Sequence, residues 1–177
     1  MKYNSTEKLR KKIRLSQYDY SSPGAYFITI CTKNRLNYFW EGELDTNSFS
    51  WKYNGINNAR PINLPLSPIG ETVLEELERW EKTYDGVSLY SYVNMPNHLH
   101  IVAVILADER GRPQQSPSVS RMVQQFKGAV TKKTGKSIWQ KSFMEHVIRD
   151  KKDYEMILKY ICENPLRWQQ DQLYSEE

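Results

Sequence analysis

The chain has 177 residues, of which 39% are hydrophobic and 26% charged, and its formal net charge at pH 7 is +4. This length is typical of one domain that buries a core without disulfides or structural zinc. Cys31 and Cys162 have neither metal-site spacing nor the density of a secreted scaffold, so we expect free buried thiols. No apolar run approaches membrane-spanning length and the N-terminus lacks a signal-peptide pattern, which predicts a cytoplasmic protein without membrane association.

Positive charge is concentrated in the first fourteen residues and in the stretch 121–152, whereas the stretch 41–109 is acidic. Such segregation is typical of a surface that binds a polyanion, because each phosphate contact releases counterions. Twelve tyrosines and five tryptophans favour nucleic acid as the partner, since exposed rings stack on unpaired bases. The alternative is an ordinary solvated helix face and a basic tail. The side chains expected to contact DNA are Lys11, Lys12, Arg14, Arg121, Lys127, Lys132 and Lys133.

The pattern of apolar and turn-forming residues predicts a single domain over the whole chain, residues 1–177. It begins with a basic arm over residues 1–20, continues as a core over 21–168 and ends in a tail over 169–177. The segment 40–66, rich in asparagine, glycine, proline and aromatic residues, fits either a hairpin or an extended loop. Apolar runs and alternating patterns elsewhere are typical of strands. Strands are therefore predicted over residues 25–32, 87–94, 98–106 and 142–148.

Three helices are predicted from apolar residues three and four positions apart and from the polar residues that precede them. The first begins at Ser67, the second at Ser118 or Ser120, and the third at Asp150. The strands on either side of the turn at 95–97 should pair antiparallel. The expected fold class is therefore α+β, with an antiparallel sheet of four to five strands and helices covering one face.

Two histidines, His98 and His100, stand at the start of a strongly apolar run. Alternate residues of a strand share a face, so both imidazoles point the same way, about 6–7 Å apart. That spacing suits two ligands of one divalent metal ion. The alternative is a pair of surface histidines at the start of a strand. The third histidine, His146, shares a strand face with Met144 and Ile148, which favours a core or supporting residue over a metal ligand.

The predicted C-terminal helix has an apolar stripe, and one of its tyrosines lies outside this stripe. Asn164 follows Tyr160 by four residues and falls beside it on the same helix edge. The helix therefore displays a phenol and an amide together. Tyr154, the other tyrosine of the helix, lies on the stripe and is more typical of a core residue. Asn164 also suits a helix cap before Pro165.

Together these residues resemble a known family, the single-tyrosine HUH transposases, and within it the REP-associated tyrosine transposases. The resemblance rests on Met-Pro-Asn-His-Leu-His at 95–100 and on Tyr-Ile-Cys-Glu-Asn-Pro at 160–165. It extends in the expected order from Ile13 to Trp168. Further matching segments are Pro23–Thr32, Gln124–Val130 and Ile138–Gln140.

The resemblance implies a ferredoxin-like sandwich and a set of site residues. By position, His98 and His100 bind the metal and Tyr160 is the nucleophile. Asn164 stands where a polar third ligand is expected, with Glu163 beside it as an alternative. The implied ion is Mg²⁺ or Mn²⁺. Because two imidazoles are softer ligands than Mg²⁺ prefers, Mn²⁺ should also support activity.

The activity implied by the resemblance is metal-dependent cleavage and rejoining of single-stranded DNA at hairpin, or palindromic, sequences. It proceeds through a covalent 5′-phosphotyrosine, and the protein acts as a monomer or a homodimer. The alternative is a hairpin-binding regulator that keeps the fold without catalysis. Both alternatives have single-stranded or hairpin DNA as the partner, and only the enzyme needs the histidine pair, the tyrosine and the asparagine together.

Overall fold

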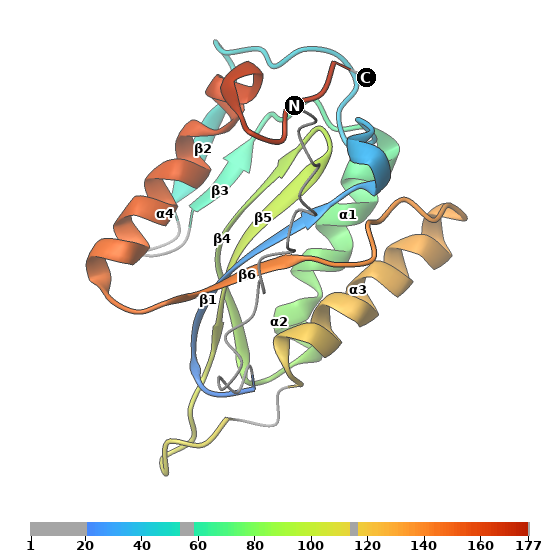
Figure 1. Cartoon of the computed structure of the whole chain (residues 1–177). Coiled ribbons are helices and arrows are strands. Elements are labelled where there is room, and N and C mark those ends of the chain that lie inside the picture. Colours follow the sequence, from blue (N-terminus) through green and yellow to red (C-terminus); the bar gives the residue numbers. More distant parts are fainter. Residues whose placement is uncertain (1–20, 54–58, 114–116, 177) are drawn as a thin grey trace, which may run out of the picture.

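The computed structural model describes residues 21–53, 59–113 and 117–176. A six-stranded sheet in the order β2-β3-β4-β5-β1-β6 forms the centre, with helices on both sides (Figure 1). The strands are β1 (Gly24–Cys31), β2 (Ser50–Tyr53), β3 (Ala59–Ile62), β4 (Val87–Met95), β5 (His98–Ile105) and β6 (Met144–Ile148). The α-helices are α1 (Pro68–Glu78), α2 (Trp80–Thr83), α3 (Val119–Thr134) and α4 (Lys151–Glu163), and the 3-10 helices are η1 (Lys33–Arg35) and η2 (Pro165–Gln170). Among the described helices, none has both the length and the apolar character needed to cross a bilayer.

The α+β class expected from the sequence is confirmed, but the sheet differs from the expected four or five antiparallel strands. The segment 40–66 contributes the hairpin β2–β3, and β3 runs parallel to β4 where Ala59 pairs with Ser91. The sheet therefore has six strands and is mixed. These two strands have only four residues each, too few for a clear alternating pattern. The antiparallel pair on either side of the turn at 95–97 is present as β4 and β5, and β1 is the other neighbour of β5.

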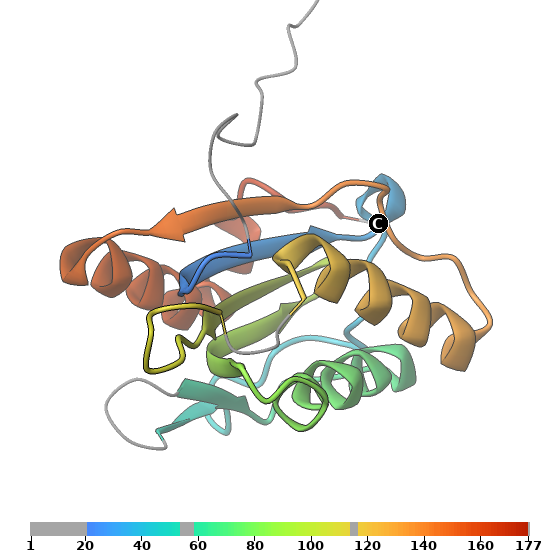
Figure 2. The ribbon, with the colours of Figure 1, turned by 90° about the horizontal axis from the view of Figure 1, so that it is seen from below.

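The main core lies between the sheet and the helices α1, α2 and α3 (Figure 2). Tyr26 and Ile28 of β1 and Ile101 of β5 are fully buried on this side. Leu77 of α1 and Val130 of α3 pack against them from the helices. Because side chains alternate along a strand, the residues between these ones face the other side of the sheet.

Helix α4 covers that other side, which corrects the expectation that the helices cover one face only (Figure 2). A smaller cluster joins Val93 and Val102 of the sheet to Ile157 and Ile161 of α4. Tyr154 packs against this cluster, as expected for a residue on the apolar stripe. His98 and His100 share a strand face with Val102, so the histidine pair lies on the α4 side. Periodicity identifies a buried helix stripe but does not tell which face of the sheet it covers.

The start of α1 is fixed by a close approach of two backbone segments. The hydroxyl of Ser67 caps the helix by accepting the N–H of Gly70 at 3.0 Å, and the N–H of Ser67 donates to the carbonyl of Phe39 at 2.9 Å. A β-carbon on Gly70 would collide with that same carbonyl oxygen. Around Gly128, an exposed glycine within α3, the corresponding space is open.

We expect Gly70→Ala to lower the free energy of unfolding by about 1–3 kcal/mol, the usual cost of forcing an extra carbon into a packed position. Gly128→Ala is the matched control and should raise it by about 0.5–1 kcal/mol, because glycine is unfavourable inside a helix. Urea denaturation followed by circular dichroism measures both values. Similar effects of the two substitutions would contradict the close approach at Gly70.

Candidate metal centre and its tyrosine

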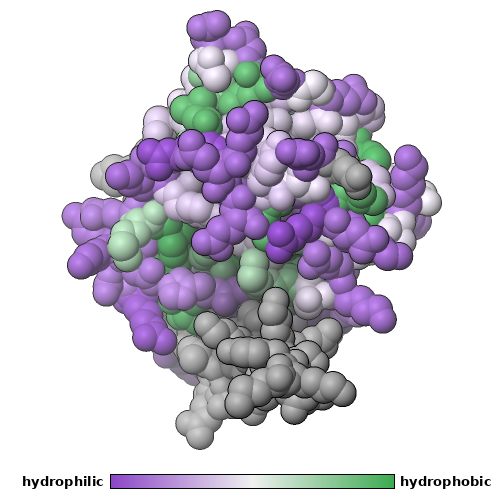
Figure 3. Space-filling model, turned by 45° about the horizontal axis from the view of Figure 1, so that its top comes forward, coloured by the Kyte–Doolittle hydropathy of each residue, from purple (hydrophilic) through white to green (hydrophobic). Residues whose placement is uncertain are grey.

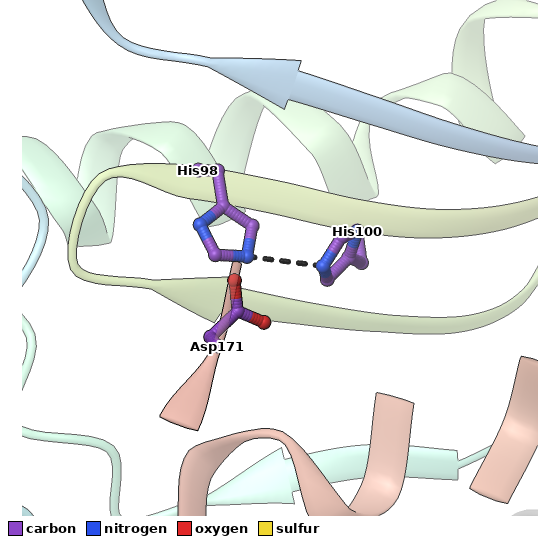
Figure 4. A group of neighbouring side chains, drawn as sticks. All are labelled: His98, His100 and Asp171. Atoms are coloured by element: carbon purple, nitrogen blue, oxygen red, sulfur yellow. Dashed lines mark hydrogen bonds between the residues drawn. The ribbon is translucent and has the colours of Figure 1, made fainter. Parts of the chain in front are cut away.

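Strand β5 holds His98 and His100 with their rings turned toward one another, and their Nε2 atoms are 3.0 Å apart (Figure 4). Both side chains are buried, with exposed fractions of 0% and 2%. The carboxylate of Asp171, which directly follows η2, faces the same space. One potential ligand atom from each of the three residues lies within 4.8 Å of the others. The arrangement is therefore compact enough for a single metal ion.

The ring of His98 is oriented by a hydrogen bond at Nδ1, the nitrogen that does not face His100. This atom lies 2.8 Å from Oδ1 of Asn97. The amide nitrogen of Asn97 donates to the carbonyl oxygens of Arg35 and Leu173, at 3.0 and 2.9 Å. The amide oxygen therefore faces His98, and as an oxygen it can only accept. His98 must carry its proton on Nδ1 and direct an unprotonated Nε2 into the site.

Both imidazoles are neutral at neutral pH. Burial is the main cause that lowers the pKa of His98 to about 3, and the charge of Arg35 is the second cause. Burial also holds the pKa of His100 well below its ordinary value, with the neighbouring His98 adding to this effect and Asp171 opposing it. The Nδ1 atom of His100 is 2.9 Å from the hydroxyl of Thr29, which can donate or accept. A neutral imidazole is the form that binds a metal.

Helix α4 brings Tyr160 to the same space. The phenolic oxygen lies 3.2 Å from Nε2 of His100 and donates a hydrogen bond to Oδ2 of Asp171 at 3.0 Å. The edge of its ring packs against Phe27, and 42% of the side chain is exposed. Burial, followed by the charge of Asp171, raises the pKa of Tyr160 above its ordinary value. In this arrangement the phenol is protonated and open to solvent on one side.

Asn164 lies at the end of α4 with an exposed fraction of 3%. Its Nδ2 donates to Oδ2 of Asp171 at 2.8 Å, whereas its Oδ1 is buried and has no hydrogen-bond partner within the described ranges. Its backbone N–H bonds to the carbonyl of Tyr160 at 3.0 Å, so the residue also ends the helix. A buried amide oxygen without a partner is costly, and a cation near it would remove that cost.

Asp171 is the residue that the sequence analysis missed. It lies in the segment expected to be a tail, and no periodic pattern or motif there points toward the histidine pair. Its second oxygen accepts the N–H of Leu173 at 2.6 Å. The chain that follows it is tied back to the domain by long-range hydrogen bonds, which only the folded structure reveals. The ties run from Arg35 to the carbonyl of Gln172, from Asn97 to that of Leu173, and from Asn37 to that of Ser175.

His146 lies outside this group. Its side chain is 51% exposed, and its Nε2 lies 2.8 Å from Oδ2 of Asp153 in the first turn of α4. Of the two roles expected for it, that of a core residue is wrong, because β6 is an edge strand and Met144, on the same strand face, is exposed as well. The contact between His146 and Asp153 links the start of α4 to strand β6.

Two of the lysines assigned to DNA make contacts within the protein. The Nζ atom of Lys127 donates to the carbonyl oxygens of Gln140 and Ser142 at 2.8 and 3.0 Å, so its side chain does not simply face outward. Burial lowers the pKa of Lys127 to about 8. Lys133 lies 2.7 Å from the buried carboxylate of Glu76 and joins α3 to α1.

The other expected DNA contacts divide into two groups. Arg121 and Lys132 are exposed on α3, on the opposite side of the sheet from the histidine pair. The basic residues of the N-terminal arm lie outside the described residues. These are Lys11, Lys12 and Arg14.

No family model matches this chain, but known sequences and a solved structure are similar to it. A solved structure of a REP-associated tyrosine transposase bound to a REP hairpin has a similar fold, with a TM-score of 0.56. The two chains are 22% identical, and the similarity covers 87% of this chain and 74% of the other. The fold is therefore that of a tyrosine transposase of this kind.

Sequence relatives lead to the same family. An uncharacterized protein of Haemophilus influenzae is 34% identical over 98% of this chain and 97% of its own length. The REP-associated tyrosine transposase of Escherichia coli is 32% identical over 78 residues, which cover 44% of this chain and 43% of that protein. The chain belongs to the family of the Haemophilus influenzae protein and is homologous to the REP-associated tyrosine transposases.

We expect Asp171→Asn to lower the pKa of Tyr160 relative to the wild-type protein. The charge of the carboxylate and its acceptance of the phenolic hydrogen both favour the protonated phenol, so removing them makes ionisation easier. NMR of protein labelled with ¹³C-tyrosine, followed through the alkaline range without metal, measures this pKa. Asp153→Asn removes a carboxylate bound to His146 and should leave Tyr160 unchanged. A Tyr160 titration identical in all three proteins would contradict the role given to Asp171.

Proposed function

We propose that the protein is a metal-dependent endonuclease and strand-transferase that acts on hairpin-forming single-stranded DNA through a covalent 5′-phosphotyrosine at Tyr160. The observation that carries the proposal is the position of the Tyr160 hydroxyl, 3.2 Å from a nitrogen of the His100 ring within the same chain. Homology to the REP-associated tyrosine transposases supports the reaction class. A monomer then contains every residue that the chemistry needs.

The donor atoms fit a divalent cation. With metal–nitrogen distances of about 2.1 Å, two ligands at right angles are about 3.0 Å apart, and the two Nε2 atoms are separated by 3.0 Å. Oδ1 of Asn164, which is buried without a partner among the described residues, would be the third ligand. The carboxylate of Asp171, which also faces the histidine pair, would remain available to the hydroxyl of Tyr160. When bound, Mg²⁺ or Mn²⁺ polarises the scissile phosphate and neutralises its developing charge.

Tyr160 supplies the nucleophile, and Asp171 receives its proton. Oδ2 of Asp171 already accepts the phenolic hydrogen, so the proton has a short path as the phenolic oxygen attacks phosphorus. A tyrosine–phosphorus bond forms and the bond from phosphorus to the 3′-oxygen breaks, which leaves a 3′-hydroxyl after protonation. Because the phosphotyrosine keeps the energy of the broken bond, a 3′-hydroxyl can attack it in turn and rejoin the strand.

We expect His98→Ala and His100→Ala to abolish Mn²⁺ binding and to reduce cleavage by several orders of magnitude. Affinity for hairpin DNA should remain, because it comes mainly from phosphate contacts and stacking. Calorimetry measures the metal, and a cleavage assay uses hairpin oligonucleotides from the gene's own flanks. His146→Ala is the matched control and should change neither. Undiminished Mn²⁺ binding in the double variant defeats the assignment, and a wild type that binds hairpins without cutting them favours the regulator.

We expect Tyr160→Phe to lose cleavage while it keeps folding, metal binding and DNA binding, because only the phenolic oxygen is removed. Tyr154→Phe is the matched control on the same helix and should cleave normally. Incubation of the wild type with a cleavable hairpin and Mn²⁺, followed by digestion and mass spectrometry, should place a nucleotide adduct on the peptide with Tyr160. An adduct on Tyr154, or robust cleavage by the Tyr160→Phe variant, would overturn this mechanism.

A further inference from the structure

Two successive residues of η1, Asn34 and Arg35, have left-handed backbone conformations, each with a φ angle of 58°. Asparagine enters this region at little cost, because its short polar side chain can bond locally, whereas a long side chain such as that of arginine disfavours it. Backbone strain of this kind persists only where surrounding contacts impose it, and it concentrates at functional sites. Arg35 therefore occupies a position whose backbone favours glycine or asparagine over a long side chain.

Hydrogen bonds to the main chain hold this conformation. The carbonyl of Arg35 accepts Nδ2 of the buried Asn97 at 3.0 Å, and its N–H donates to the carbonyl of Thr32 at 3.3 Å. The hydroxyl of Thr32 donates to the carbonyl of Leu36 at 2.8 Å and closes the turn. None of these bonds uses the guanidinium, so they would hold a glycine at position 35 equally well. The turn itself does not explain the arginine side chain.

The guanidinium of Arg35 lies at the surface beside the candidate metal centre. The side chain is exposed, and its Nη1 donates to the carbonyl of Gln172, the residue after Asp171, at 3.2 Å. Its charge is close enough to His98 to contribute to the lowered pKa of that ring. This end of the molecule is at the top of Figure 1 and is turned forward in Figure 3, where the surface is mostly hydrophilic.

The charge of this guanidinium has no counter-ion in the described part of the chain. The bond to Gln172 uses one of its five N–H donors, and no described carboxylate forms an ion pair with it. A fixed positive charge beside a metal centre repels the cation, so it works against metal binding unless an anion offsets it. The position therefore suits an anionic ligand that arrives together with the metal.

We propose that Arg35 is a further catalytic residue, whose guanidinium binds the phosphate that Tyr160 attacks or the phosphate next to it in the strand. The proposal rests on the proposed function and adds to it a positive group that the protein itself supplies. The planar fork of arginine matches two oxygens of one phosphate. Because hydrogen bonds already hold the backbone of η1, the guanidinium can stabilise the charge of the transition state without reorganisation of the turn.

The first test compares the cleavage of hairpin DNA by variants at position 35. Arg35→Gly should be at least as stable to urea as the wild type, because glycine relieves the strain, yet cleave about 100- to 1,000-fold more slowly. Arg35→Lys keeps the charge without the fork and should cleave at a rate between these two. Asn37→Ala is the matched control, since it also removes a hydrogen bond to the C-terminal segment but no charge, and it should cleave normally.

Two further measurements separate this role from a structural one. If Arg35 acted only by holding the segment after Asp171, Arg35→Gly would lower the stability and also lower the pKa of Tyr160, as Asp171→Asn does. We expect neither change, and we expect the variant to bind Mn²⁺ at least as tightly as the wild type, because a repelling charge is gone. Lower stability together with a lower Tyr160 pKa would overturn the proposal.

The second test locates the phosphate. One neutral methylphosphonate at a time replaces a phosphate in the single-stranded flank of the hairpin oligonucleotide, and fluorescence anisotropy measures binding without metal, so that no strand is cut. At the contacted phosphate, the neutral linkage should weaken binding to the wild type by about tenfold, the usual effect of a lost hydrogen bond to a charged group. Arg35→Gly should bind that oligonucleotide and the unmodified one equally well.

Weakening that is the same in wild type and Arg35→Gly at every position would overturn the contact. If Arg35→Gly does not fold, Arg35→Gln replaces it under the same criterion. A wild type that shows the coupling at one phosphate but cleaves no hairpin DNA refutes the proposed catalysis and not the contact. A wild type that cleaves but shows no coupling at any phosphate refutes the contact alone.

Discussion

Asn97 lies in the turn between β4 and β5 with its side chain fully buried, and its amide joins three parts of the molecule. The nitrogen bonds to the carbonyls of Arg35 in η1 and Leu173 in the C-terminal segment, while the oxygen accepts from His98. An amide satisfies these partners in one orientation only, so the ring of His98 and the path of the chain after Asp171 are fixed together. An apolar side chain here would leave buried polar groups unpaired, at a cost of about 1–3 kcal/mol for each group. Asn97 therefore positions both the ring of His98 and the segment that follows Asp171.

The position of the proton on the His98 ring determines the position of the proton on the His100 ring. With the proton of His98 on Nδ1, its bare Nε2 lies 3.0 Å from Nε2 of His100, and two facing lone pairs at this distance would repel. His100 must therefore hold its proton on Nε2 when no metal is bound, and Thr29 must donate to its Nδ1. Binding of a cation requires the opposite tautomer of His100, with Thr29 as acceptor. A hydroxyl can rotate between the two roles, so the second imidazole adapts while the first is fixed.

Local patterns were sufficient to predict the parts of the site that lie on regular elements. Strand alternation places His98 and His100 on one face, and helix periodicity separates Tyr160 from Tyr154. Asp171 was not predictable in this way, because its position depends on hydrogen bonds to residues far away in the chain. Local patterns also could not predict which face of the sheet α4 covers. The helical pattern predicts that Lys127 faces solvent, but its long side chain folds back to two carbonyl oxygens that no helical pattern reveals.

The groups proposed to bind DNA and the groups proposed to cleave it lie on opposite sides of the sheet. The exposed basic residues of α3 lie on one side and the centre with Tyr160 lies on the other. DNA that contacts both sides of the sheet must pass one of its edges. One edge strand is β6, and only β1 separates it from β5, the strand that carries the histidine pair. Exposed basic side chains flank β6 in sequence, before it, in the turn after it and in the first turn of α4. They are Lys141, Arg149, Lys151 and Lys152. Under the proposed function, positive charge would attract phosphate over roughly a Debye length of about 8–10 Å. A duplex stem placed on α3 would then have a more favourable route to Tyr160 past β6 than past the short hairpin β2–β3 at the other edge.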